Sequence, residues 1–323
     1  MGKHDTAIGV WLSDKERFAD LYNGALCDGE TFFKAEDLER IDTKQNLILK
    51  NHYGKDMHIQ KFRDIAMKSS SGARLFLLTC ENQDTIHLGM PVRSMLYDSL
   101  EYANQIKIIS SKNRAEKNYN NSSEFLSGIT EQDRLAPIIP LVFYYGDEEW
   151  SKNLDLHSLL DISEEDYRKF HSYIPNYKIN LISAKELAKK NCLHTDLQQI
   201  LGMLQYKGDK KKLLGYIQDN RTFFENIDAD SYNAAKVFLG SEVQLRELKK
   251  KEDSVDMCKA LDDFYQDGVN EGIERGLEQG ITTANERYSK LIIKLSEEGK
   301  TEWILKVAND SDFREQLYRE YDL

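Results

Sequence analysis

Residues 62–83 read Phe-Arg-Asp-Ile-Ala-Met-Lys-Ser-Ser-Ser-Gly-Ala-Arg-Leu-Phe-Leu-Leu-Thr-Cys-Glu-Asn-Gln. Segments 57–67 and 74–83 have the composition of strands, and the polar run 68–73 between them predicts a hairpin turn. Opposite residues in an antiparallel pair have a constant sum of residue numbers, so a turn centred on Gly72 and Ala73 places Asp64 opposite Glu81. Their Cβ atoms would then lie roughly 5 Å apart.

This hairpin has two acids at positions where the alternating pattern of a strand predicts apolar residues. Two carboxylates so close repel each other, and a shared divalent cation relieves that repulsion. Gln83 lies two residues beyond Glu81 and therefore points to the same face of its strand. We interpret Asp64, Glu81 and Gln83 as a candidate metal site.

The constellation resembles the metal site of the PD-(D/E)xK nuclease superfamily, with Gln83 where Lys is more usual. Three segments, 14–23, 81–98 and 136–150, resemble segments of the Rpn-type recombination-promoting nucleases, also labelled putative transposases, and follow one another in the same order. The resemblance implies a PD-(D/E)xK-like core and a metal-dependent DNA endonuclease. It also implies a role in recombination, mobile elements or defence against foreign DNA.

In this hypothesis Mg²⁺ or Mn²⁺ is bound by Asp64, Glu81 and the main-chain carbonyl of Asn82, all of which are hard oxygen ligands. The metal polarises the phosphoryl oxygen and lowers the pKa of an attacking water, which Gln83 could hydrogen-bond. An acid from the first helix often completes such sites. Glu16 and Asp20 share a helix face, and Asp20 is preferred because it lies within the matching segment.

The overall charge constrains how such an enzyme could meet DNA. The net charge of −11 argues against a general polyanion binder, because phosphate neutralisation needs concentrated Lys and Arg. A local basic patch or bound metal must do this work. The candidates for DNA contact are Arg93, Lys107, Lys112, Arg114 and Lys117. Arg63 alternates to the opposite face from Asp64, where a structural ion pair is expected.

The remaining pattern indicates a mixed order of helices and short strands, that is, an α/β or α+β fold with a central mixed sheet flanked by helices. Ser13 and Glu16 form a capping-box start for the first helix. Pro91 begins a helix to about Lys107, followed by a long loop over 110–133. Its predicted inward stripe is Val92, Met95, Leu96, Ser99, Ala103 and Ile106. Further strands are expected at 141–145 and 177–182.

Three segments are predicted along the chain: a nuclease core at 1–206, a helical extension at 207–265, and a helical association module at 266–323. The last carries glycines at four-residue spacing, Gly268 to Gly280, beside an apolar series from Val269 to Ile281. Small residues so spaced allow close approach of two backbones. The series predicts either a homodimer helix or a loose repeat linker.

The four cysteines are far apart and form no CxxC pair, so neither structural zinc nor a disulfide framework is indicated. We expect a reducing, cytoplasmic compartment and no membrane span. The sequence contains no GxSxG, P-loop or HExxH motif. Two rivals to the nuclease stay open: a catalytically degenerate nuclease fold that binds DNA or protein, and a regulatory partner-binding protein.

Overall fold

The computed structural model describes residues 3–41, 44–50, 56–71, 74–240 and 253–323. The chain divides into two compact units, Met1–Cys258 and Lys259–Leu323. The three-part organisation with boundaries near 206 and 265 stays a prediction.

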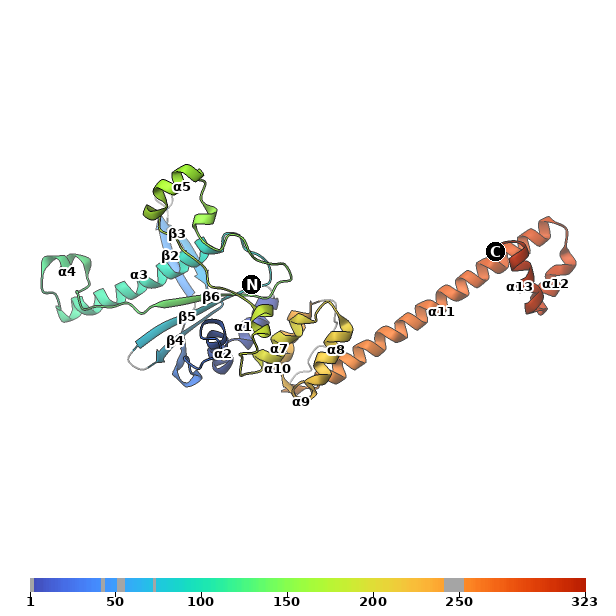
Figure 1. The fold of residues 1–323 in the computed structure, drawn as a ribbon, viewed down its shortest axis with the longest axis horizontal. Helices are drawn as coiled ribbons and strands as arrows, with labels where there is room; N and C mark the ends of the chain where they lie inside the picture. The colour runs from blue at the N-terminus through green and yellow to red at the C-terminus, as the bar shows by residue number, and fades with distance from the viewer. Residues whose placement is uncertain (1–2, 42–43, 51–55, 72–73, 241–252) are drawn as a thin grey trace. The chain divides into compact units, whose positions relative to one another are not determined.

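The first unit is built on a five-stranded mixed sheet with the strand order β1-β4-β5-β6-β7 (Figure 1). The strands are β1 (Leu38–Arg40), β4 (Ile65–Ser71), β5 (Arg74–Gln83), β6 (Ile138–Tyr144) and β7 (Leu181–Ser183). Neighbours from β1 to β5 are antiparallel, whereas β5, β6 and β7 are parallel. The predicted mixed sheet flanked by helices is confirmed.

The predicted hairpin is correct in register and wrong in extent. Ile65 pairs with Cys80 and Ser71 with Arg74, which is the predicted sum of residue numbers. Gly72 and Ala73, the predicted centre of the turn, lie outside the described residues. The predicted strand 57–67 is interrupted: β3 (Asp56–Phe62) pairs instead with β2 (Lys44–Lys50) in a separate two-stranded sheet. The run 68–71, predicted as turn, continues β4.

One face of the sheet is covered by α1 (Lys3–Trp11), α2 (Lys15–Leu26) and α10 (Ala229–Leu239). The Tyr22 hydroxyl of α2 donates to the carbonyls of Thr79 and Ile139, at 2.8 and 2.9 Å, on β5 and β6. The Trp11 and Phe238 rings join α1 to α10 with centroids 5.6 Å apart. Because these contacts tie the helices to two neighbouring strands, the positions of β5 and β6 are firmly set.

The N-cap of α2 is Asp14, whose carboxylate accepts from the amides of Glu16 and Arg17. The predicted cap, Ser13, instead donates to the carbonyl of Gly9. The first helix of the sequence analysis therefore begins one residue later than expected, and α1 precedes it.

The opposite face of the sheet is covered by α3 (Met90–Glu116), where Met90 packs with Val142 and Tyr144 of β6. The helix runs nine residues beyond the predicted end, and α4 (Ser122–Ser127) lies in the predicted loop. The predicted inward stripe is also wrong. The helix buries Ser94, Tyr97 and Asp98, while Val92, Ser99 and Ala103 are exposed. The helix is rotated because Asp98 is buried as the partner of an arginine, described below.

Short elements complete the first unit. They are η1 (Ala35–Asp37), η2 (His157–Leu159), α5 (Glu164–Phe170), η3 (His171–Tyr173), α6 (Ala184–Lys189), α7 (Leu197–Gly202), η4 (Met203–Gln205), α8 (Lys210–Asp219), α9 (Arg221–Phe224), β8 (Ile227–Asp228) and β9 (Ser254–Val255). None of the four cysteines, Cys27, Cys80, Cys192 and Cys258, is part of a disulfide bond.

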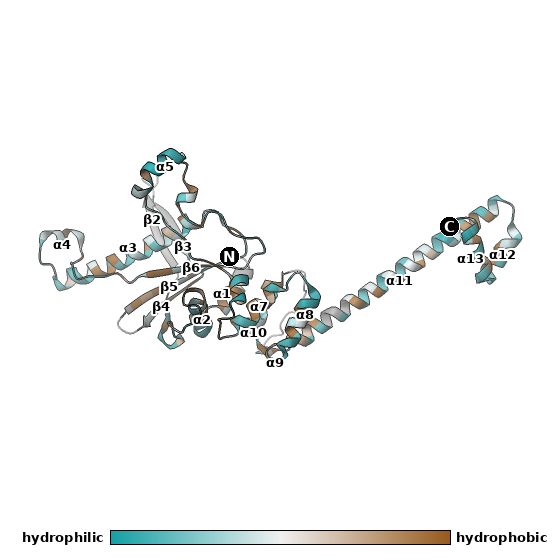
Figure 2. Cartoon of the chain, in the orientation of Figure 1, coloured by the Kyte–Doolittle hydropathy of each residue, from teal (hydrophilic) through white to brown (hydrophobic). Residues whose placement is uncertain are grey.

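The second unit contains most of α11 (Met257–Glu297), with α12 (Thr301–Asn309) and α13 (Ser311–Glu320). Its core is formed by Leu291, Leu295, Val307, Leu317 and Tyr318. Hydrophilic and hydrophobic residues alternate along α11 (Figure 2). Within the described part of the chain, no helix combines the length and the apolar composition that a membrane span requires.

Candidate functional site

The acid pair lies where β4 begins and β5 ends. Extending the β4–β5 register by one residue places Asp64 opposite Glu81, as predicted. Asp64 is half-buried, and its Oδ2 accepts the amide N–H of Asn82 at 2.7 Å. The carboxylate of Asp64 thus takes the place of a main-chain acceptor at the end of the ladder, and this bond fixes its position beside β5.

The same bond orients the main chain of Asn82. In a β-ladder, the N–H and C=O of one residue point to the same neighbouring strand. Because the Asn82 N–H reaches Asp64, its carbonyl points toward the Asp64 side as well. The Asn82 side chain lies on the other face, with Nδ2 3.9 Å from where a Cβ on Gly9 would stand. The position of the carbonyl suits the metal-ligand role predicted for it.

Glu81 is the most constrained group of the site, with only 2% of its surface exposed. Its Oε2 lies 2.9 Å from Nη2 of Arg93, and among the described residues its Oε1 has no hydrogen-bond partner. Burial raises the pKa of Glu81 to about 8, and Asp64 contributes to the rise while Arg93 opposes it. Glu81 is therefore a carboxyl that the protein solvates poorly.

Arg93, predicted as a DNA contact, lies beside the acid pair. It comes from the first turn of α3, and its Nε donates to the Tyr97 hydroxyl at 3.1 Å. Its side chain is 32% exposed, so the guanidinium approaches Glu81 from the solvent side. The nearby Glu81 carboxylate helps to raise the pKa of Arg93, although burial works in the opposite direction. Arg93 is the cation that faces Glu81 in this structure.

Arg63 forms the expected structural ion pair, but on an unexpected face. Its guanidinium, 3% exposed, contacts the Asp98 carboxylate of α3 and donates to the Thr79 hydroxyl. Asp98 also accepts from the Tyr177 hydroxyl. The prediction that Arg63 points away from the acid face is wrong, because residues 63–64 interrupt the strand and its alternation ends there. This buried pair holds α3 against the sheet and so positions Arg93.

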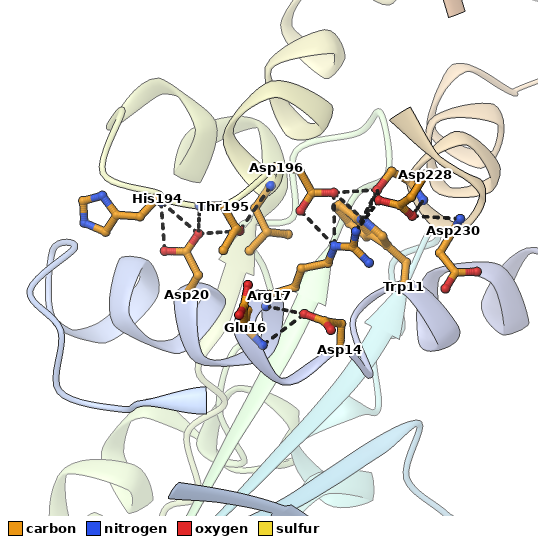
Figure 3. A network of polar contacts seen from close by, with 12 residues as sticks. Trp11, Asp14, Glu16, Arg17, Asp20, His194, Thr195, Asp196, Asp228 and Asp230 are labelled. Atoms are coloured by element: carbon orange, nitrogen blue, oxygen red, sulfur yellow. Dashed lines mark hydrogen bonds and ion pairs between the residues drawn. The ribbon is translucent and has the colours of Figure 1, made fainter. Parts of the chain in front are cut away.

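The acids of α2 do not join the site. The carboxylate of Asp20 accepts from the amides of His194 and Thr195 and from the Thr195 hydroxyl, at 2.6 to 3.0 Å (Figure 3). Glu16 is exposed on the first turn of α2. In the described ranges, no cluster of three or more His, Cys, Asp or Glu residues is arranged to hold a metal ion. The expectation that Asp20 or Glu16 completes the ligand set is therefore corrected, since Asp20 instead fixes the loop before α7.

A second network ties the helices together beside Asp20. Arg17 bridges two acids that precede helices, with Nε 2.8 Å from Asp196 and Nη2 2.5 Å from Asp228 (Figure 3). Ser231 of α10 donates to Asp196, and the Trp11 indole donates to Ser231. These contacts join α1, α2, α7 and α10, so we assign Arg17 a structural role.

The other predicted DNA contacts lie far from the acid pair. Lys107, Lys112, Arg114 and Lys117 are all exposed near the C-terminal half of α3. At a rise of about 1.5 Å per residue, Lys107 and Arg114 lie roughly 20 and 30 Å along the helix from Arg93. Lys107 and Arg114, seven residues apart, share a helix face that Lys112 does not. They can contact a long nucleic acid but not the phosphate at the acid pair.

A second polar cluster at the same edge of the sheet, here called the lysine pocket, was not predicted from the sequence. Lys185, Lys189 and Lys207 line a pocket of about 530 Å³ together with Asp147. The available signal was weak: two lysines at four-residue spacing, and a lysine run after 206 that was interpreted only as a boundary.

Comparison with known proteins bears on this fold. Residues 94–234 match the family model of the putative transposases, YhgA-like. The match confirms the resemblance predicted from the motifs, since this family is the Rpn-type, PD-(D/E)xK-like group of putative transposases. It spans α3 to α10 and leaves Asp64, Glu81 and Gln83 outside. Neither the curated proteins nor the solved structures contain a significant match.

Proposed function

We propose that this chain is a metal-dependent nuclease that hydrolyses phosphodiester bonds in DNA, as a protein of mobile-element type. The family match supports the general class. The observation that carries the chemistry is Glu81, a buried carboxyl beside Asp64 whose Oε1 has no hydrogen-bond partner among the described residues. Enzymes place poorly solvated acids where a cation or a proton is to be bound.

The available donors suit a hard divalent cation. Asp64 and Glu81 supply carboxylate oxygens, Asn82 supplies a main-chain carbonyl, and Gln83, half-buried on the strand face of Glu81, supplies an amide. Bound Mg²⁺ or Mn²⁺ would polarise the phosphoryl oxygen and lower the pKa of a water. Gln83 would orient that water by a hydrogen bond. It brings no positive charge, unlike the lysine of the wider superfamily.

Arg93 explains how the acid pair is held without a metal. Its guanidinium attracts the ionised form of Glu81 and so opposes the rise of the Glu81 pKa. We propose that a cation displaces it from Glu81, and that the partly exposed guanidinium then contacts the phosphate. In this role Arg93 would supply the positive charge that Gln83 lacks.

The same ion pair favours the rival function. A nuclease fold that has lost its metal would need a resident cation to satisfy Glu81, and Arg93 provides one at 2.9 Å. The chain would then bind DNA or protein without cleaving it. The two functions differ in whether metal competes with Arg93.

A plasmid-nicking assay in Mg²⁺ and in Mn²⁺ separates them. We expect cutting by the parent and a loss of about three orders of magnitude in Asp64→Ala and Glu81→Ala, because a catalytic metal supplies several kcal/mol. Asp84→Ala is the matched control, since Asp84 is exposed and its carboxylate accepts a hydrogen bond from the neighbouring Thr85 hydroxyl. Cutting that persists in both site variants refutes the site. Absence of cutting by the parent in either metal favours the binding module.

We also propose that the second unit joins two copies of the chain. Ile273, Leu277 and Ile281 of α11 are 55–67% exposed. A Cβ added at Gly272 or Gly276 would meet no described atom within 4 Å. An apolar series beside small residues on a charged helix favours association with a like helix. A homodimer would also suit the cutting of two DNA strands.

A further inference from the structure

The lysine pocket lies in the first unit between α6, η4 and the loop after β6. Asp147 of that loop contacts two lysines, Lys185 Nζ at 3.1 Å and Lys207 Nζ at 2.9 Å. Lys185 and Lys207 are 29% and 22% exposed, so the fold holds both side chains in place. Lys189, one turn beyond Lys185 on α6, also lines the pocket. Two ammonium groups from separate segments thus converge on Asp147, and the side chain of Lys189 lines the same cavity.

The pocket lies at the same end of the sheet as the acid pair, because Asp147 follows β6 and Lys185 follows β7. The strand ends Gln83, Tyr144 and Ser183 form one row across β5, β6 and β7. A Cβ on Gly146 would lie 2.3 Å from the Asp84 carbonyl, so the loop carrying Asp147 passes directly beside the end of β5. Two strand spacings make roughly 10 Å between β5 and β7. This is the axial length of about three base pairs of B-DNA.

The charge of the pocket identifies the class of its ligand. Hydrogen bonds from Lys207 and Lys185 hold the pKa of Asp147 below its usual range, so Asp147 is an anion. Its carboxylate is 64% exposed and sits between the two ammonium groups as a phosphate oxygen would. Glu186 engages Lys189 at 2.5 Å on the exposed side. A backbone phosphodiester has two non-bridging oxygens and a single negative charge, as the Asp147 carboxylate has, so it can contact the same two ammonium groups in its place.

We propose that Lys185, Lys189 and Lys207 form a subsite for the nucleic-acid backbone, in which a phosphate displaces Asp147 at the same end of the sheet as the acid pair. The inference rests on the proposed function and specifies how a chain of net charge −11 holds its substrate. The subsite reads the backbone and not the bases. Among the described residues that line the pocket, the one aromatic ring is that of Tyr206, which packs against Tyr216 with ring centroids 5.3 Å apart.

The test is binding of a fluorescently labelled DNA duplex to the full chain in EDTA, where no metal supports cleavage. Anisotropy is measured over a range of salt concentrations. The variant is Lys185→Ala, Lys189→Ala and Lys207→Ala combined. The control removes the same charge from exposed lysines elsewhere in the first unit, Lys34→Ala, Lys152→Ala and Lys169→Ala.

Each lysine that neutralises a phosphate contributes about 0.9 to the slope of log affinity against log salt. We expect the triple variant to bind about tenfold or more weakly and to lose roughly two to three from that slope. The control variant should change the affinity and the salt slope by less than the triple variant does. Equal losses in variant and control, or a parent that does not bind the duplex, would overturn the subsite.

A second variant predicts the opposite sign and does not depend on lysine removal. Asp147→Asn frees Lys185 and Lys207, so DNA should bind about two- to fivefold more tightly, the worth of an exposed ion pair. Unchanged or weaker binding by a folded Asp147→Asn protein contradicts the displacement. Lysine-dependent binding without metal-dependent cutting would leave the subsite standing and refute the nuclease. Metal-dependent cutting without lysine-dependent binding would support the nuclease and refute the subsite.

Discussion

Replacing Glu81 with Gln should make the first unit more stable at alkaline pH and leave its stability unchanged near pH 5. The pKa of Glu81 is raised from 4.5 to about 8, chiefly by burial. The folded state therefore keeps a proton that the unfolded chain has already released between these values. Stability consequently falls as pH rises through this window, by about 1.4 kcal/mol per pH unit, and levels off above pH 8. Summed over the window, the ionised carboxylate costs the fold roughly 4 to 5 kcal/mol.

Gln cannot ionise, so Glu81→Gln should lose this pH dependence while keeping the size of the side chain. Urea unfolding followed by tryptophan fluorescence at pH 5 to 9 measures the difference. Trp11 and Trp150 lie in the first unit and Trp303 in the second. Introducing Trp303→Phe into both proteins restricts the signal to the first unit.

The free energies of unfolding of the two proteins should coincide near pH 5 and separate by several kcal/mol at pH 8.5. Glu16→Gln removes an exposed carboxyl and controls for the change in charge. Parallel pH curves, or a Glu81→Gln protein that is less stable at pH 8.5, would refute the claim that ionisation of the buried Glu81 carboxyl destabilises the fold.

Three further outcomes are expected. Metal binding needs the Glu81 carboxylate, so calorimetry should show Mn²⁺ affinity rising about tenfold per pH unit up to about pH 8, with proton release; a flat profile contradicts this. Arg63→Ala leaves the buried Asp98 carboxylate with the Tyr177 hydrogen bond but without its cationic partner, which should lower the free energy of unfolding by about 3–5 kcal/mol, whereas Arg168→Ala breaks an exposed pair and should cost about 0.5 kcal/mol or less. Similar losses in the two variants would show that the Arg63 pair is not structural. If the second unit joins two copies, a chain ending at residue 258 should have the light-scattering mass of a monomer. The dimer proposal is rejected if the measured mass, divided by the mass of one chain, is the same for the shortened chain and the full chain.

The acid pair was predictable because a hairpin is a local structure. Its register depends on a turn within a few residues and on alternation along two adjacent segments. The pairing of Ile65 with Cys80 therefore followed from the sequence. The interruption of the strand at 63–64 could not be predicted from the sequence, because it arises where β3 pairs with β2 in a separate sheet.

The predictions for the site that were wrong depended on packing between segments that are distant in the sequence. The hydrophobic period of α3 placed Val92 and Ser99 on the inward face and did not include Asp98. The helix instead turns Asp98 inward to meet Arg63, and this rotation carries Arg93 to Glu81. A periodicity argument counts apolar residues, so it cannot anticipate a helix face that buries an ion pair.

The sequence alone determined the sheet-forming hairpin, the facing positions of Asp64 and Glu81, and the resemblance to the Rpn-type putative transposases. Tertiary structure alone decided which charges meet: Arg93 with Glu81, Asp20 with the loop at His194, and Asp147 with Lys185 and Lys207. The physical reason is range. Turns and alternation act over a few residues, whereas an ion pair joins whichever groups the packed helices and strands bring within about 4 Å.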